Sequence, residues 1–141
     1  DLRRARAACQ SIVPTTTGAA KALTNIFPRL KSVIGGCGIR VPVINGSLTD
    51  ITLNIDELTS IQEINSIFKK EADINFNKII QYTDEPIVSV DIIGNSFSCV
   101  FDSELTSVIG NMVKIVGWYD NETGYTNRLI DLTNLSVKKR S

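Results

Sequence analysis

A group of hydroxyl-bearing residues near the start of the chain could bind an anion. Thr15, Thr16 and Thr17 stand directly before Gly18 and a segment of helical apolar spacing, which is the pattern of a helix N-terminus. The first turn of a helix has unpaired backbone N–H groups and a partial positive charge, so hydroxyls and a glycine at this point suit a phosphate group. The alternative is ordinary helix capping, because threonine-rich helix starts are common.

Arginine residues provide a second set of candidates for anion binding. Arg40 lies between two apolar residues of a strand-like segment, and its rigid fork of donors could hold two anions. The alternative is a solvated arginine on the polar side of a strand. Arg3, Arg4 and Arg6 form a basic cluster ahead of the threonines, which could bind a phosphate or a partner's carboxylates, or could be a plain surface run.

A third group of polar and aromatic residues occupies positions 118–125, at a predicted turn from a strand into a helix. Asn121 has two donors and an acceptor in one amide, which is the group needed to hold another amide in a single orientation. Tyr119 and Tyr125 could enclose a flat ring. The alternative is that Asp120 or Asn121 caps the following helix while the aromatic side chains pack as core.

The composition excludes several kinds of chemistry. The chain has 141 residues and no histidine, so histidine-based triads, Cys–His dyads and histidine zinc sites cannot be formed from it, and we expect no metal. Cys9, Cys37 and Cys99 form no CxxC pattern, which favours reduced thiols buried as small apolar residues.

Composition and hydropathy indicate a folded globular protein, and the odd number of unpatterned cysteines leads us to expect a cytoplasmic one. Hydrophobic residues make up 43% of the chain and charged residues 21%, and there is neither a secretory leader nor an apolar run of about 20 residues. The formal net charge is zero, with basic residues gathered at both ends and a mildly acidic remainder, so we expect no nucleic-acid partner and no membrane partner. We interpret the basic end, Lys138, Lys139 and Arg140, as a solvated terminus.

Apolar periodicity predicts an α+β domain: a mixed, largely antiparallel sheet with helices packed on one face, ending in a C-terminal helix. A helix from residue 19 should end near Phe27, because Pro28 follows. Asn45-Gly46 predicts a hairpin between strands at 39–44 and 47–55. A capping box at residues 60–63 begins a second helix, which runs to about residue 72 with Ile61, Ile64, Ile67 and Phe68 on its buried face. The remaining predicted elements are strands at 79–82, 87–92, 97–101 and 112–118 and a helix at 125–137.

Five motifs, separated along the chain, together resemble those of one known protein family. They are residues 1–8 (DLRRARAA), 12–22 (IVPTTTGAAKA), 40–42 (RVP), 84–89 (DEPIVS) and 118–125 (WYDNETGY) followed by Arg128. In this order and at this spacing they closely resemble the phosphorylating glyceraldehyde-3-phosphate dehydrogenases. The resemblance covers essentially all of residues 1–141 and corresponds to the latter part of the catalytic domain. The dinucleotide-binding domain and the first catalytic segment of that family lie upstream.

The resemblance implies an activity and an assembly. The family oxidises and phosphorylates glyceraldehyde 3-phosphate to 1,3-bisphosphoglycerate with NAD and inorganic phosphate, as a cytoplasmic homotetramer. Its cysteine nucleophile, in a Ser-Cys-Thr-Thr-Asn-Cys motif, and its histidine base are not in this chain, and Cys9, Cys37 and Cys99 match no position of that motif. We therefore expect no catalytic nucleophile or base among these residues.

The resemblance also implies phosphate-binding positions. Arg4 matches the residue that binds the terminal phosphate of the substrate. Thr17 and Gly18 match the site for inorganic phosphate, in agreement with the helix-terminus argument. Arg40 matches the arginine placed between the two anion sites.

Two further positions match cofactor-binding residues. Asn121 matches the residue that hydrogen-bonds the nicotinamide carboxamide, and Tyr125 matches the aromatic residue beside that ring. Residues 1–10 correspond to the end of a loop that contacts a neighbouring subunit.

One departure from the family pattern follows residues 40–42, where many members read Thr-Pro-Asn-Val-Ser and this chain reads Val-Ile-Asn-Gly-Ser. The change affects the predicted hairpin turn and no anion ligand. Two alternatives remain: erythrose-4-phosphate dehydrogenase, and an isolated non-catalytic module that binds anions or a subunit. Residues 15–20 and Tyr119 resemble the triose enzyme better.

Overall fold

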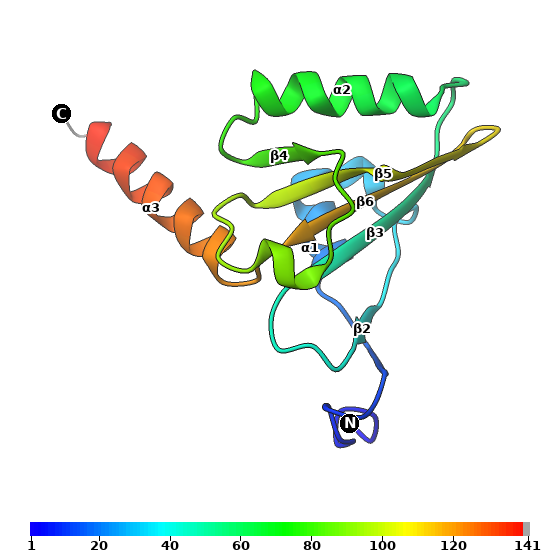
Figure 1. Ribbon diagram of the computed structural model, residues 1–141, viewed down its shortest axis with the longest axis vertical. Coiled ribbons are helices and arrows are strands. Elements are labelled where there is room, and N and C mark those ends of the chain that lie inside the picture. Colours follow the sequence, from blue (N-terminus) through cyan, green and yellow to red (C-terminus); the bar gives the residue numbers. More distant parts are fainter. Residues whose placement is uncertain (140–141) are drawn as a thin grey trace. The chain divides into compact units, whose positions relative to one another are not determined.

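The computed structural model describes residues 1–139 of the chain. These residues form two compact units, Asp1–Ile44 and a second that begins at Asn45. Each unit contains a sheet of its own, with two strands in the first and four in the second (Figure 1). The predicted α+β class is confirmed.

In the first unit, β1 (Val13–Thr15) pairs antiparallel with β2 (Gly38–Arg40). Helix α1 (Ala19–Ile26) and the 3-10 helix η1 (Pro28–Leu30) lie between them in the chain. The helix ends just before Pro28, as predicted, because proline has no N–H to continue the hydrogen-bond ladder. No residue of α1 is buried, so the apolar face predicted for this helix is not covered by other residues of the first unit.

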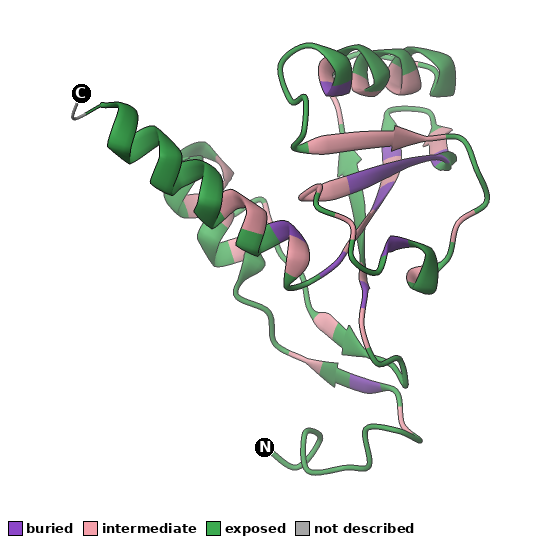
Figure 2. Cartoon of the chain, turned by 60° about the vertical axis from the view of Figure 1, so that its left-hand side comes forward, coloured by how far each residue is buried: buried purple, intermediate pink, exposed green. Residues whose placement is uncertain are grey.

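The second unit is built on a mixed four-stranded sheet. Across the sheet the strands are β3 (Ser47–Asn54), β6 (Met112–Tyr119), β5 (Cys99–Ile109) and β4 (Ile80–Thr83). Strand β4 runs parallel to β5, while the β3–β6 and β6–β5 pairs are antiparallel. Figure 2 shows that the most deeply buried strand is β5.

Helix α2 (Ile61–Asp73) lies across β4 and β5 (Figure 1). Phe68 stacks on the fully buried Phe101 with ring centroids 4.0 Å apart, which forms the centre of the core. The helix starts at the predicted place, with the Glu63 amide donating to Ser60 Oγ at 3.1 Å. Of the apolar side chains predicted to be buried, Ile61 and Ile67 are exposed, since the helix packs mainly on β4 and β5.

Helix α3 (Thr123–Lys138) ends the described chain and begins two residues earlier than predicted. Figure 2 shows it as exposed along most of its length. Lys138 and Lys139 are exposed as expected of a solvated basic end, whereas Arg140 lies outside the described residues. No helix in residues 1–139 combines the length and apolar character needed to cross a membrane.

The predicted hairpin at Asn45-Gly46 is wrong. Strand β2 stops at Arg40 and pairs with β1, while β3 pairs with β6, so residues 41–46 connect two different sheets. Gly46 does adopt the positive φ that the motif indicates, at +89°, but for a different reason. A Cβ on Gly46 would lie 2.8 Å from the carbonyl oxygen of Ser89, so the glycine allows a close approach to that backbone.

The predicted strand at 87–92 is also wrong, since Ser89–Ile92 forms the 3-10 helix η2. The Asp91 carboxylate accepts a hydrogen bond from the Val88 amide at 2.7 Å, and this local turn competes with strand pairing. Ile92 is buried, so the apolar residues that suggested a strand contribute one side chain to the core.

Replacing Gly46 by alanine should lower the free energy of unfolding by about 2–3 kcal/mol, because the methyl group adds a backbone clash to an unfavourable φ. Gly110→Ala is the matched control, since Gly110 has φ +62° but open space around its Cβ position, and should cost about 1 kcal/mol. Chemical denaturation measures both. Equal losses for the two variants would contradict the close approach.

Candidate functional site

The first candidate site lies within the first unit, where Arg4 reaches the threonine segment. Arg4 Nε donates to Thr15 Oγ1 at 2.6 Å, and its Nη2 donates to Thr16 Oγ1 at 3.1 Å. The Asp1 carboxylate lies 3.5 Å from Arg4 Nε, with both side chains about half exposed. A residue eleven positions before the threonines is thus brought to their hydroxyls, and an incoming anion would compete with Asp1 for the guanidinium.

Thr17 and Gly18 lie at the start of α1, as the sequence predicts. Thr17 Oγ1 accepts a hydrogen bond from the Ala19 amide at 3.2 Å, and the first helical bond runs from the Ala22 amide to the Gly18 carbonyl at 2.9 Å. The N-cap residue itself is Gly18, which has no side-chain cap, so Thr17 stabilises the turn that precedes the helix. The backbone N–H groups of the first turn precede the helical ladder, which leaves donors for an anion at this end.

Arg40 is the last residue of β2 and faces Val13 across the two-stranded sheet. Thr15 pairs with Gly38, so Arg40 and Thr15 are diagonal neighbours on one face, with Cα atoms about 7–8 Å apart in such a pairing. The side chain of Arg40 is exposed and forms no hydrogen bond or ion pair with any residue in the described part of the chain. Its charge is thus uncompensated on the face that carries Arg4 and Thr15.

The other two arginines of the basic cluster do not join Arg4. Arg3 and Arg6 line a shallow groove together with the apolar side chains of Leu2, Ile12 and Pro14. The cluster is therefore divided, and only Arg4 contacts the threonine hydroxyls.

The second candidate site lies in the second unit, at the turn from β6 into α3. Asp120 is 3% exposed and has four hydrogen-bond donors around its carboxylate. Oδ1 accepts from the amides of Glu122 at 2.9 Å and Thr123 at 2.8 Å, while Oδ2 accepts from Asn45 Nδ2 at 3.0 Å and the Gly94 amide at 2.9 Å. Asp120 therefore holds the backbone at the entry to α3, whose N-cap residue is Glu122 with no side-chain cap, and also joins two distant loops.

These donors change the acidity of the carboxylate. The N–H of Thr123, followed by those of Gly94 and Glu122, stabilises the charged form and holds the pKa of Asp120 well below its usual range. Burial acts in the opposite direction and is outweighed. The positive end of α3 is a further reason for a negative charge at this position.

Asn121 follows directly and is held by β3. Ser47 Oγ donates to Asn121 Oδ1 at 2.8 Å. Within residues 1–139, Asn121 Nδ2 makes no hydrogen bond, so two donors remain for a ligand amide. Ser47 and Tyr119 are direct partners in the β3–β6 register, which explains how the serine reaches the turn.

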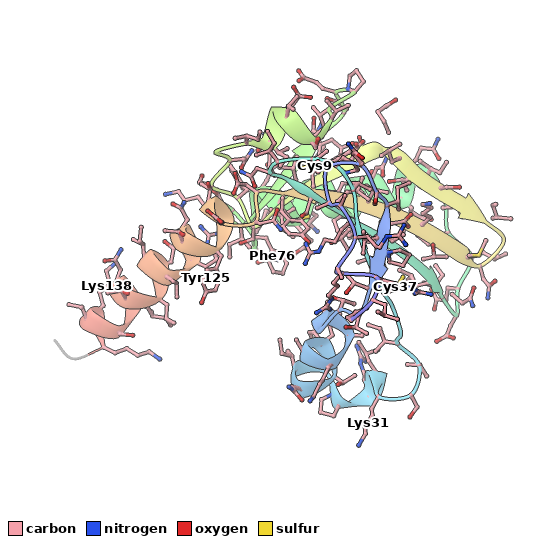
Figure 3. All side chains as sticks on the ribbon, turned by 90° about the horizontal axis from the view of Figure 1, so that it is seen from below. Cys9, Lys31, Cys37, Phe76, Tyr125 and Lys138 are labelled. Carbon is pink, nitrogen blue, oxygen red and sulfur yellow. The ribbon has the colours of Figure 1, made fainter. Side chains whose placement is uncertain are left out.

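The aromatic residues around the turn have separate environments. Trp118 Nε1 donates to the buried Asp102 carboxylate at 2.9 Å, so this ring belongs to the sheet. Tyr125 lies on the first turns of α3 (Figure 3). Its side chain is 65% exposed, so it is not core and its ring is accessible. The described residues show no second ring enclosing a space with Tyr125.

Two contacts fix the start of α3 in the second unit. A Cβ on Gly124 would lie 2.7 Å from the Phe97 carbonyl oxygen, so the helix backbone approaches this segment directly. Arg128 Nη1 donates to the Lys78 carbonyl at 2.6 Å, and its Nη2 lies 2.9 Å from the Asp131 carboxylate. Together with Asp120, these contacts hold the turn that carries Asn121.

The three cysteines differ in environment. Cys9 and Cys37 are exposed, which contradicts the expected burial, and Cys99 is half-buried in β5. Burial raises the pKa of the Cys99 thiol, which disfavours the reactive thiolate. All three are free.

Three residues of this site have no sequence signal that predicts their part in it: Ser47, Asn45 and Gly94. Ser47 lies 74 positions from Asn121, and Asn45 lies 75 positions from Asp120. The β3–β6 register places Ser47 beside the turn, and the hydrogen bonds to Asp120 place Asn45 and Gly94 there, whereas the sequence at Asn45-Gly46 predicts only a turn.

The fold and these side chains define an α+β domain with a candidate anion site and a candidate amide-binding turn. The chain matches the family described as glyceraldehyde 3-phosphate dehydrogenase, C-terminal domain, over residues 1–121. It belongs to this family.

Sequence identity to individual proteins supports the same family. The chain is 52% identical over 134 residues to glyceraldehyde-3-phosphate dehydrogenase 2 of Streptomyces avermitilis, covering 94% of this chain and 40% of the relative. It is 50% identical over 138 residues to glyceraldehyde-3-phosphate dehydrogenase of Mycobacterium leprae, and 51% identical over 138 residues to that of Mycobacterium tuberculosis, covering 98% of this chain and 41% of each relative. The chain thus spans about two fifths of the length of the relatives it matches.

Asp120→Asn should lower the stability of the protein at neutral pH, because the amide cannot match a carboxylate as acceptor of four donors. A lowered folded-state pKa contributes stability that is present above the unfolded pKa of about 3.9 and is lost as pH falls below it. The difference between the two proteins should therefore shrink as pH falls below about 4. Thermal unfolding between pH 7 and 3 measures this.

Asp73→Asn is the control, because Asp73 is exposed and its carboxylate has no partner among residues 1–139. A difference for Asp120→Asn that stays constant across this pH range would contradict the stabilised carboxylate.

Proposed function

We propose that this chain is the latter part of the catalytic domain of an NAD-dependent glyceraldehyde-3-phosphate dehydrogenase, which oxidises and phosphorylates glyceraldehyde 3-phosphate to 1,3-bisphosphoglycerate. The observation that carries the proposal is the position of Arg4, hydrogen-bonded to Thr15 and Thr16 immediately before the Thr17–Gly18 helix start. The names of the relatives support the same activity.

The first unit would bind the two phosphate groups. Arg4 would bind the terminal phosphate of the substrate, and Thr17 with Gly18 would bind inorganic phosphate at the start of α1. Arg40 has a free guanidinium on the face that carries Thr15, and a fixed fork of donors can serve two anions. These groups would offset the mutual repulsion of two dianions and hold them in a fixed geometry.

The second unit would orient the cofactor. NAD, when bound, accepts the hydride from the substrate. The free Nδ2 of Asn121 fits the carbonyl oxygen of a carboxamide, and the accessible ring of Tyr125 fits the side of a flat heterocycle. By holding the amide in one orientation, Asn121 would fix which face of the ring meets the substrate.

The covalent chemistry would come from residues outside this chain. The chain has no histidine, and Cys9, Cys37 and Cys99 do not match the nucleophile of the family. In the proposal, the nucleophilic cysteine and the base histidine lie upstream, and the complete subunits assemble as a cytoplasmic homotetramer.

A second candidate function applies to the 141-residue chain by itself. Because it has no histidine, it would act as a non-catalytic anion-binding or subunit-interaction module. Phosphate binding without NAD turnover by this chain would support that function. The names of the relatives favour the triose substrate over erythrose 4-phosphate.

Arg40→Ala in a full-length enzyme carrying this segment should reduce kcat/KM for inorganic phosphate by about 10- to 100-fold, the value of one or two charge-assisted hydrogen bonds. Arg40→Lys should restore only part of this loss, since it keeps the charge and not the fork. Steady-state kinetics at varied phosphate measures the effect.

Arg29→Ala is the control, because Arg29 is exposed on η1 and has no partner within residues 1–139. If Arg40→Ala and Arg29→Ala give the same kinetics, Arg40 has no anion role.

Asn121→Ala should weaken NAD binding by about 10-fold and reduce the stereospecificity of hydride transfer, because the carboxamide loses its directional partner. Fluorescence titration measures NAD binding. Turnover with a cofactor deuterated at C4 of the nicotinamide shows which face of that ring takes part in hydride transfer. Unchanged affinity together with full stereospecificity would reject the cofactor role of Asn121.

A further inference from the structure

We propose that Ser47 is a positioning residue for cofactor binding, which holds the Asn121 amide in the orientation that the nicotinamide contact requires. The inference rests on the proposed function of Asn121. It adds a residue from a different strand, 74 positions away in the sequence.

The contact is a direct hydrogen bond. Ser47 Oγ donates to Asn121 Oδ1 at 2.8 Å, a normal length for a hydroxyl donor. A side-chain amide is planar, so fixing its oxygen also fixes the direction of both hydrogens on Nδ2. Those hydrogens have no acceptor in residues 1–139, which leaves them directed to a ligand.

Both ends of this hydrogen bond are themselves held. Ser47 is the first residue of β3 and pairs with Tyr119, two positions before Asn121. On the other side of Ser47, Asn45 Nδ2 donates to the Asp120 carboxylate at 3.0 Å. Strand pairing and the bond to Asp120 therefore hold the backbones of Ser47 and Asn121 close enough for their side chains to meet.

The contribution of this bond to stability is small, whereas its effect on orientation is large. Ser47 is half-exposed, Asn121 is exposed, and both groups would find water if the bond were broken. Without the serine, rotation of the amide exchanges its donor and acceptor ends, and the acceptor would then face the ligand's carbonyl oxygen. Loss of Ser47 should thus affect cofactor binding more than folding.

The test is a double-mutant cycle in a full-length enzyme carrying this segment. We expect Ser47→Ala to weaken NAD binding by about 3- to 10-fold, equivalent to one neutral hydrogen bond, and to lower the stereospecificity of hydride transfer. In the Asn121→Ala background, Ser47→Ala should cause no further loss, because the serine acts through the asparagine. The melting temperature should remain close to that of the parent enzyme.

Matched variants separate the hydroxyl from the shape of the side chain. Ser47→Thr keeps the hydroxyl and should bind NAD as the parent does, whereas Ser47→Val, of the same shape as threonine, should show the loss. If Ser47→Ala does not fold, the comparison of Ser47→Thr with Ser47→Val tests the inference in its place. Thr49→Ala is the control on the same strand, since Thr49 is exposed and its side chain has no partner in the described chain.

The experiment distinguishes failure of the inference about Ser47 from failure of the proposed cofactor role of Asn121. If Asn121→Ala impairs NAD binding while Ser47→Ala and Ser47→Val do not, the inference about Ser47 is overturned and the proposed function stands. Additive losses in the double mutant also overturn it. If Asn121→Ala itself has no effect, the cofactor role of the turn fails, and the role of Ser47 fails with it.

Discussion

The carboxylate of Asp120 joins three segments of the second unit that are far apart in the sequence. It accepts hydrogen bonds from the first amides of α3, from the Gly94 amide and from the Asn45 side chain. A buried acceptor surrounded by four donors is favourable only as an anion, and the lowered pKa of Asp120 has this cause. The next residue is Asn121, so the backbone position of the turn that carries it depends on Asp120, while its side chain is held by Ser47. The close approaches of Gly46 and Gly124 to neighbouring backbone stabilise the same arrangement.

The two candidate sites are built in different ways. The anion site of the first unit uses a helix start and a two-stranded pairing, with Arg4 reaching residues only 11 and 12 positions away. The amide-binding turn of the second unit depends on contacts over 26, 74 and 75 positions. A change at β3 or at Gly94 should therefore affect the cofactor half of the proposed function, while the phosphate half depends on residues 1–44.

This difference explains how much the sequence could predict. The threonine start of α1, its end before Pro28 and the cap of α2 at Ser60 are local patterns, and the structure confirms each. The Asn45-Gly46 hairpin is wrong because a positive φ serves a tight turn and a close approach equally well, and only the Ser89 backbone decides between them. The strand at 87–92 is wrong because the Asp91 side chain closes a local turn. Ser47 could not be found from its neighbours, since its partner is set by the β3–β6 register.

Hydrogen exchange at the amides of Gly94, Glu122 and Thr123 tests the central claim most directly. If one carboxylate holds all three, their exchange should be slowed by similar factors in the parent protein and should become faster together in Asp120→Asn, while the Ala22 amide of α1 is unchanged. Exchange of the Gly94 amide at the rate of an open loop in the parent protein, or loss of protection at only one of the three in the variant, would contradict the account.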